Sequence, residues 1–158
     1  MIRNTAHYNT HTTDHFVSRT VRNRMSQYVN IAKAMMSRGV TSNGRTFNCT
    51  FAVKKGKVLA IGVNNYRRQV RYMKQFKTDV RYYGEDNYQM SLHGEISCLL
   101  KLGYEDCSDI DFFSIRIDNN NHCRCSQPCK NCERILRMVG FNHIYYFDEN
   151  MQLCVMRQ

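Results

Sequence analysis

The apolar positions of the chain fall into short strand-like runs and longer stretches of helical period. Apolar runs predict strands at 47–53 and 58–63, and the alternation of apolar and polar residues predicts one at 111–118. Further strands are expected at 143–147 and 152–156. Apolar residues three and four apart predict helices at 25–36, 92–102 and 128–139, with Ser91 as the cap of the second and Pro128 as the first residue of the third. Strands that alternate with helices of this length indicate an α/β layered domain.

Two short connections predict how the strands pair. The Lys-Lys-Gly-Lys segment at 54–57 separates the first two strands and is typical of a hairpin turn. Only about three residues, Asp148-Glu149-Asn150, separate the last two strands. So short a link permits an antiparallel hairpin and excludes a parallel crossover.

Residues 66–83 repeat aromatic and aliphatic side chains at helical spacing, with cations on the other faces. We therefore expect a basic amphipathic helix here. Aromatic side chains can stack on unpaired bases while cations follow phosphates, so segment 65–83 is a candidate nucleic-acid contact. The alternative is a helix that packs against another subunit in a homo-oligomer and exposes a solvated basic face.

Domain organisation is simple. Residues 1–20 are polar and rich in histidine, and we expect a flexible arm followed by one domain over 21–158. The chain shows no secretory signal and no run near the roughly 20 apolar residues that span a bilayer. We expect a cytoplasmic protein without a membrane partner.

Charge is distributed unevenly over the 158 residues, whose formal net charge is +10. Residues 15–78 contain 14 Lys or Arg and no acid, whereas residues 79–158 contain 12 of the 13 acids. This split predicts a surface for the phosphates of a nucleotide, a nucleic acid or a lipid headgroup, with plain solubility as the alternative. Arg67 and Arg68 are the cations we expect to contact a nucleotide.

Two short motifs carry the candidate chemistry: His93-Gly94-Glu95 and the Pro-Cys-Lys-Asn-Cys segment at 128–132. Cys129 and Cys132 are three apart at the start of a predicted helix, so both thiols share one face, and the helix N-terminus favours their thiolate forms. One imidazole from His93 and two thiolates would bind Zn²⁺ and leave the fourth tetrahedral position open for water. Glu95 is then the candidate general acid and base, provided that the site lies at the first turn of its helix.

These motifs resemble the H-x-E…P-C-x-x-C signature of the zinc-dependent cytidine and deoxycytidylate deaminase superfamily. The resemblance implies a cytidine-deaminase-like three-layer α/β/α sandwich around a mixed five-stranded sheet. It also implies Zn²⁺ as the cofactor and Glu95 as the catalytic residue. Gly62-Val63-Asn64 is similar to the family's G-x-N segment, whose asparagine contacts the sugar. Gly94 stands where the family usually has alanine.

The resemblance implies hydrolytic deamination of a base. An antiparallel C-terminal hairpin is similar to the branch of the superfamily that contains free-cytidine deaminases, some RNA-editing domains and DNA-acting toxins. We therefore expect cytosine as the base, in a free nucleoside or nucleotide. A single-stranded DNA or RNA substrate is the alternative.

Two further alternatives use the same residues differently. The eight cysteines include four between 123 and 132, and Cys123 and Cys125 could join Cys129 and Cys132 in a closed structural zinc site. Such a site would suit a nucleic-acid-binding module without activity, but it would leave His93 and Glu95 without a role. Cys49, Cys98 and Cys154 are expected in the core.

Overall fold

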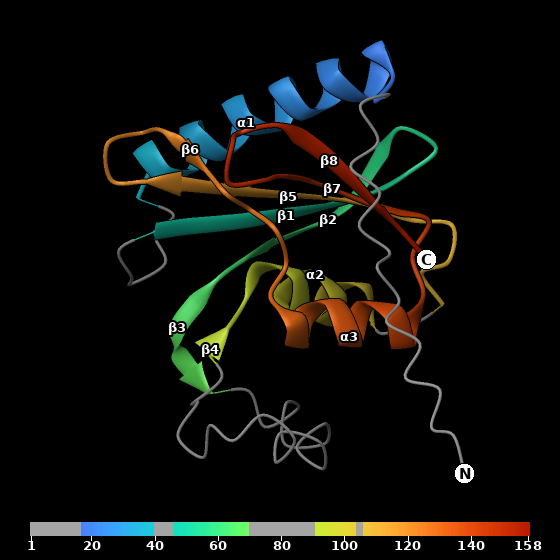
Figure 1. The fold of residues 1–158 in the computed structure, drawn as a ribbon. Coiled ribbons are helices and arrows are strands. Elements are labelled where there is room, and N and C mark those ends of the chain that lie inside the picture. The colour runs from blue at the N-terminus through green and yellow to red at the C-terminus, as the bar shows by residue number, and fades with distance from the viewer. Residues whose placement is uncertain (1–16, 40–45, 70–90, 104–105) are drawn as a thin grey trace, which may run out of the picture.

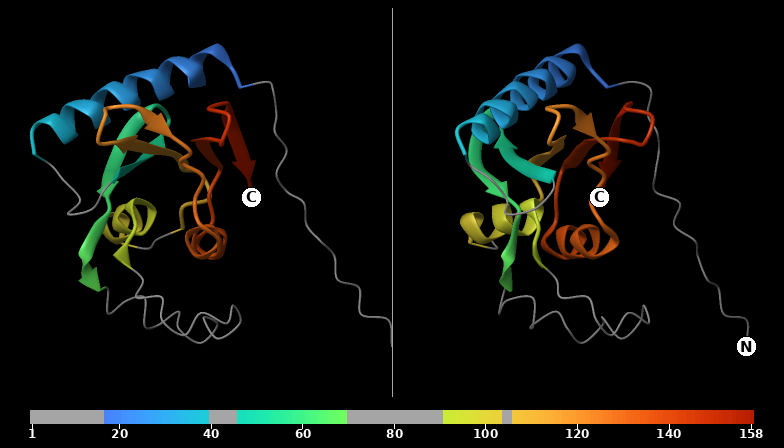
Figure 2. Two further views of the ribbon diagram at one scale, coloured as in Figure 1. Left: turned by 60° about the vertical axis from the view of Figure 1, so that its left-hand side comes forward. Right: turned by 90° about the vertical axis from the view of Figure 1, so that its left-hand side faces the viewer.

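The computed structural model describes residues 17–39, 46–69, 91–103 and 106–158, and the side chains of 66–69 and of Ser91 are not described. A sheet lies between two helical layers (Figures 1 and 2). Helix α1 (Arg19–Ser37) covers one face, and α2 (Gly94–Leu102) and α3 (Lys130–Val139) cover the other. This arrangement confirms the predicted α/β/α sandwich.

The main sheet follows the order β2-β1-β5-β7-β8. Its strands are β1 (Thr46–Lys54), β2 (Lys57–Val63), β5 (Asp111–Asp118), β7 (His143–Phe147) and β8 (Leu153–Arg157). The β5–β7 pair is parallel, and the β1–β2, β1–β5 and β7–β8 pairs are antiparallel. The mixed five-stranded sheet and its C-terminal hairpin are therefore confirmed. A sixth short strand, β6 (Cys123–Arg124), pairs with β5 and was not predicted.

A core fills each side of the sheet because most residues of β1 and β5 are buried on both faces. On the α1 side, Tyr28 stacks on Phe51 with ring centroids 4.6 Å apart and meets Phe113 edge-on at 5.0 Å. On the α2–α3 side, Phe112 and Phe141 are fully buried. Three predicted core cysteines, Cys49, Cys98 and Cys154, are confirmed as buried.

Helix α1 begins at Arg19, and the Ser18 hydroxyl accepts a hydrogen bond from the N–H of Val21 at 3.3 Å. Val17 is buried against the α1-side core. The helix thus starts inside the range expected for the arm, and residues 1–16 of that arm lie outside the described residues. No helix of the described part is long and apolar enough to cross a membrane.

Two predicted helices are wrong in part. Ser91 and Leu92 form strand β4 (Ser91–Leu92) instead of the cap and first residue of α2. The expected basic helix begins as strand β3 (Asn65–Gln69), which pairs with β4 in a small second sheet. Residues 70–83 of that expected helix are outside the described residues. The tertiary pairing of β3 with β4 overrides the helical spacing of the apolar positions.

Candidate metal and catalytic site

Helices α2 and α3 each begin at the candidate site, and the residue that caps each helix is a predicted zinc ligand. His93 precedes α2 in an extended conformation (φ −81°, ψ 158°), and Cys129 precedes α3 in a similar one (φ −65°, ψ 160°). Pro128 therefore lies before the helix. The prediction that it is the first residue of the helix is wrong. The Sγ atom of Cys129 accepts a hydrogen bond from the N–H of Cys132 at 3.4 Å, which satisfies one free donor of the first turn.

The structure brings His93, Cys129 and Cys132 together. Nδ1 of His93 lies 3.5 Å from Sγ of Cys129 and 3.3 Å from Sγ of Cys132. One ligand atom from each residue lies within 4.8 Å of the others. No other such group of histidine, cysteine and acidic residues occurs among the described residues, so Cys123 and Cys125 are not part of a closed four-thiolate site there.

These distances suit zinc. Zn–S bonds of about 2.3 Å and Zn–N bonds of about 2.0–2.1 Å in a tetrahedron place nitrogen and sulfur about 3.6 Å apart. The observed 3.3 and 3.5 Å need only small shifts to reach this geometry. Cys132 is buried, His93 is half-buried and Cys129 is exposed, so the cluster is reachable from solvent on one side.

The ionisation of the cluster is uneven. Hydrogen bonds from Cys132 and from His93 lower the pKa of the Cys129 thiol to about 4. The same bond to Cys129, together with burial, raises the pKa of Cys132 well above its ordinary value. The hydrogen bond to Cys129 also raises the pKa of His93, although burial opposes the shift. The lowered pKa of Cys129 favours its thiolate form at neutral pH.

Glu95 lies beside the cluster in the first turn of α2. Its side chain is only 7% exposed, and burial raises the pKa of its carboxyl group. It is hydrogen-bonded to the Cys132 thiol and to the Ser114 hydroxyl, the latter at 3.2 Å. His93 and Glu95 face the same site because His93 is still extended while Glu95 is already helical. The site thus lies at the first turn of α2, as a shared role for His93 and Glu95 requires.

The close contact between β2 and α2 depends on two glycines. A Cβ atom on Gly62 would lie 2.0 Å from the carbonyl oxygen of Gly94 and 2.4 Å from the backbone nitrogen of Cys98. A Cβ on Gly94 would lie 3.2 Å from Oγ1 of Thr50, which is tight but not prohibitive. Gly62 therefore lets the start of α2 pack directly against the sheet. This close contact fixes how far His93 and Glu95 lie from the sheet.

The match to a known family decides what this site is. Residues 22–148 match the family model described as "Cytidine and deoxycytidylate deaminase zinc-binding region". The chain belongs to this family. Its predicted cofactor, Zn²⁺, is confirmed by the family's zinc-binding region together with the His-Cys-Cys cluster.

Solved structures of deaminases resemble the chain at low identity. The dCMP deaminase from cyanophage S-TIM5 in apo form is 16% identical, with 84% of this chain and 86% of that chain covered and a TM-score of 0.49. Its complex with dCMP and dUMP is 17% identical, with 84% and 85% covered and a TM-score of 0.48. Cytidine deaminase from Burkholderia pseudomallei is 15% identical, with 84% and 91% covered and a TM-score of 0.47. No curated protein sequence matches the chain.

The structure describes the predicted substrate-contacting residues less completely than the His-Cys-Cys cluster. Asn64 is 2% exposed, and its amide Oδ1 accepts from the N–H of Asn48 at 2.9 Å while Nδ2 donates to the carbonyl of Thr46 at 3.3 Å. It anchors the corner where the chain leaves the main sheet for β3, and its sugar contact stays a prediction. Arg67 and Arg68 lie on β3, and their side chains are outside the described part.

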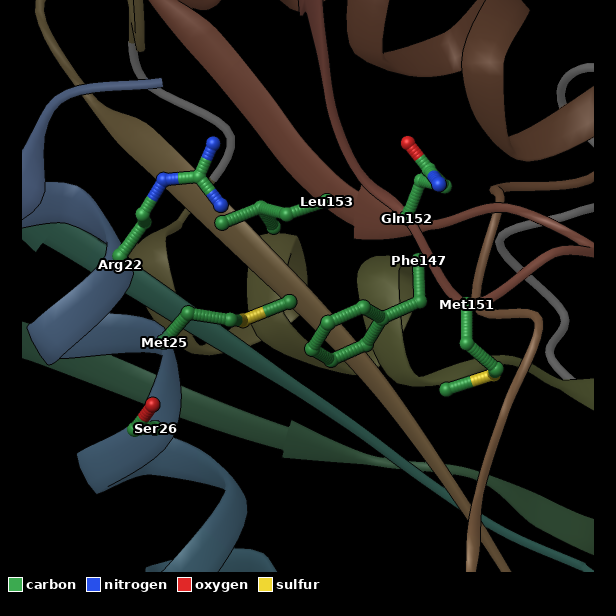
Figure 3. A pocket seen from close by; sticks show the side chains of 7 residues that line it. All are labelled: Arg22, Met25, Ser26, Phe147, Met151, Gln152 and Leu153. Atoms are coloured by element: carbon green, nitrogen blue, oxygen red, sulfur yellow. The ribbon is translucent and has the colours of Figure 1, made fainter. Parts of the chain in front are cut away.

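A hollow of about 370 Å³ lies away from this site, between α1 and the β7–β8 turn (Figure 3). Arg22 and Met25 from α1 face Phe147 and Leu153 across it. Helix α1 covers the opposite face of the sheet from α2 and α3, so this hollow does not reach the His-Cys-Cys cluster. We assign it no role in the family's chemistry.

Proposed function

We propose that the protein is a zinc-dependent hydrolytic deaminase that converts cytosine to uracil in a free nucleoside or nucleotide and releases ammonia. The observation that carries the proposal is the buried carboxyl group of Glu95 beside a cluster of one imidazole and two thiols. A structural zinc site has no need of such a carboxylate. A hydrolytic site needs one to move protons between water and the leaving amine.

His93, Cys129 and Cys132 would hold the zinc ion, and the fourth tetrahedral position would stay open for water or substrate. Zinc in such a site lowers the pKa of water toward neutrality and so supplies a nucleophile. The thiolate of Cys129 supports this assignment, because thiolates are the form that binds zinc.

Glu95 would carry protons through the whole reaction. Water oxygen forms a bond to C4 of cytosine, and Glu95 takes the proton that the water gives up. Glu95 passes this proton to the ring nitrogen N3, takes a second proton from the new C4 hydroxyl group and gives it to the amine. The C4–N bond then breaks, and ammonia leaves a uracil base. Burial raises the pKa of Glu95 and so favours its protonated form between these transfers.

The choice of cytosine as the base is supported by the hairpin of the last two strands. Strands β7 and β8 form an antiparallel hairpin, and this ending resembles the branch of the superfamily that acts on cytosine. A free nucleoside or nucleotide requires fewer contacts than a polynucleotide. The net charge of +10 supports a substrate that carries phosphate and keeps single-stranded nucleic acid as the second candidate.

A substrate panel tests the proposal. Purified zinc-loaded protein is incubated with cytidine, deoxycytidine, their monophosphates and cytosine-containing DNA and RNA oligonucleotides, and products are read by mass for a gain of about 1 Da. We expect turnover of the small substrates. Turnover of oligonucleotides alone would support the second candidate, and no turnover of any substrate would contradict the proposed activity.

Glu95→Gln separates catalysis from metal binding. The amide keeps the shape of the side chain but cannot take a proton, so we expect kcat to fall by at least about 100-fold while zinc content stays near one per chain. Glu133→Gln is the matched control, because Glu133 pairs with Arg137 at 3.0 Å on α3 and has no part in the proposed chemistry. A nucleic-acid-binding module without activity would behave identically in all three proteins.

A further inference from the structure

We propose that Ser114 is a positioning residue for Glu95, held in place by a second serine, Ser126, from the loop that leads to the zinc ligands. This inference rests on the proposed function, because it assigns the role of Ser114 through the proton transfers of Glu95. The sequence motifs of the site include neither serine.

The first contact is direct. Oγ of Ser114 donates a hydrogen bond to Oε1 of Glu95 at 3.2 Å, and the two residues are 5% and 7% exposed. Ser114 lies on the face of β5 that covers α2, since Phe112, two residues earlier, packs in the core on that side. A buried carboxylate with one oxygen held in this way has a fixed orientation.

Ser126 bridges two strands that have begun to separate. The parallel ladder of β5 and β7 ends at the pair Phe113–Tyr145. Beyond it, the Ser126 hydroxyl accepts from the N–H of Phe147 at 2.9 Å and donates to the carbonyl of Ser114 at 2.7 Å. The next rung of the ladder would join the Phe147 N–H directly to the Ser114 carbonyl. One hydroxyl group thus stands between the strands and replaces a main-chain bond.

The loop that carries Ser126 is also tied to β7 through its backbone. The N–H of Ser126 donates to the carbonyl of Phe147 at 2.9 Å, and Ser126 is 5% exposed. Cys129 follows three residues later and caps α3. The segment that supplies two zinc ligands is therefore fixed to the same residue, Ser114, that holds the carboxylate.

The arrangement gives Ser114 a specific effect on the reaction. Glu95 must exchange protons with water, the ring nitrogen and the amine in turn, so the reaction slows when the carboxylate oxygens are misplaced. Loss of a residue that orients such a group typically lowers activity 10- to 100-fold. In this proposal the Ser114 hydroxyl contacts Glu95 and not the substrate. Loss of the Ser114 hydroxyl should therefore lower kcat with little change in KM.

The experiment compares kcat, KM, zinc content and thermal unfolding in four variants. Ser114→Ala should lower kcat about 10- to 100-fold, with KM within about twofold and zinc still bound. Ser114→Thr keeps the hydroxyl and suits a strand, so it should recover kcat to within about threefold of the wild type. Ser114→Cys keeps the side-chain volume but donates weakly, so its kcat should fall with that of alanine.

The control is Ser97→Ala. It deletes the hydroxyl of a different buried serine, on α2, and should keep kcat within about twofold of the wild type. The inference is overturned if Ser114→Ala retains wild-type kcat. It is also overturned if alanine, cysteine and threonine at this position lose rate equally, since a structural role would then suffice. A wild type that deaminates nothing in the panel would refute the proposed function itself, and this assignment with it.

Discussion

Gly62 offers the sharpest test of how the fold positions the site. Its Cβ position is occupied by main-chain atoms of α2, with the carbonyl oxygen of Gly94 at 2.0 Å and the backbone nitrogen of Cys98 at 2.4 Å. Ordinary carbon contacts begin near 3.4 Å, so Gly62→Ala must push α2 off the sheet by roughly 1.4 Å. No side-chain rotation can relieve the contact, because both neighbours are backbone.

The magnitude follows from the rigidity of these neighbours. Overpacked core substitutions typically lower the free energy of unfolding by 1–3 kcal/mol, and a clash with helix backbone belongs at the upper end, so we expect a loss of about 3 kcal/mol. For a domain of this size the midpoint of thermal unfolding should fall by about 6–12 °C. His93 and Glu95 move with the helix while Cys129 and Cys132 stay on α3. Zinc affinity and kcat should therefore fall together.

Gly94→Ala is the matched comparison. Its Cβ would lie 3.2 Å from Oγ1 of Thr50 and 3.3 Å from the carbonyl oxygen of Asn48, contacts that a shift of a few tenths of an ångström relieves. Alanine also gains up to about 1 kcal/mol over glycine in a helix, so the net change should stay within about 1 kcal/mol. Urea unfolding and zinc analysis of both variants decide the matter. Wild-type stability and zinc content in Gly62→Ala would refute the reasoning.

Two other predictions follow from the site and from the α1-side core. Zinc uptake by metal-free protein at pH 7 should release about one to two protons, because Cys132 and the protonated fraction of His93 must lose theirs while Cys129 is already ionised. Both raised pKa values make the apparent zinc affinity increase as pH rises from 6 to 8, and a titration with an indicator dye that detects no proton release would contradict this. Phe51→Ala deletes a fully buried ring stacked on Tyr28 and should lower the free energy of unfolding by about 3–5 kcal/mol, measured in urea. Because Phe51 packs on the α1 side, the folded fraction of this variant should still bind zinc, and a metal-free folded form would be inconsistent with the two-sided core.

Much of the fold could be predicted because it depends on local pattern. Strands β1, β2, β5, β7 and β8 were all expected to within two residues, since their apolar runs end at turn residues. The short link after β7 was sufficient to predict the antiparallel hairpin. The clustering of His93, Cys129 and Cys132 could be predicted from the spacing of the two cysteines and from the pairing of His93 with Glu95.

The elements that could not be predicted depend on contacts between distant segments. Strand β4 has two residues, and only its pairing with β3 makes it a strand, so neither pattern nor propensity predicts it. The Ser126 hydroxyl can bridge Phe147 and Ser114 only because β5 and β7 separate at Phe147. No local sequence pattern predicts this separation. One signal was present and missed: Ser114 is a polar residue between Phe113 and Ile115, in the part of β5 where four successive residues are buried.

The capping role of Cys129 bears on how the protein acquires its metal. Its sulfur accepts from the N–H of Cys132 and its pKa is lowered to about 4, so one free donor of the first turn of α3 is satisfied without an ion. We therefore expect a newly synthesised chain to fold before it loads zinc. Chelation should then yield an inactive but intact reservoir of protein, which regains function on resupply without passing through the unfolded state.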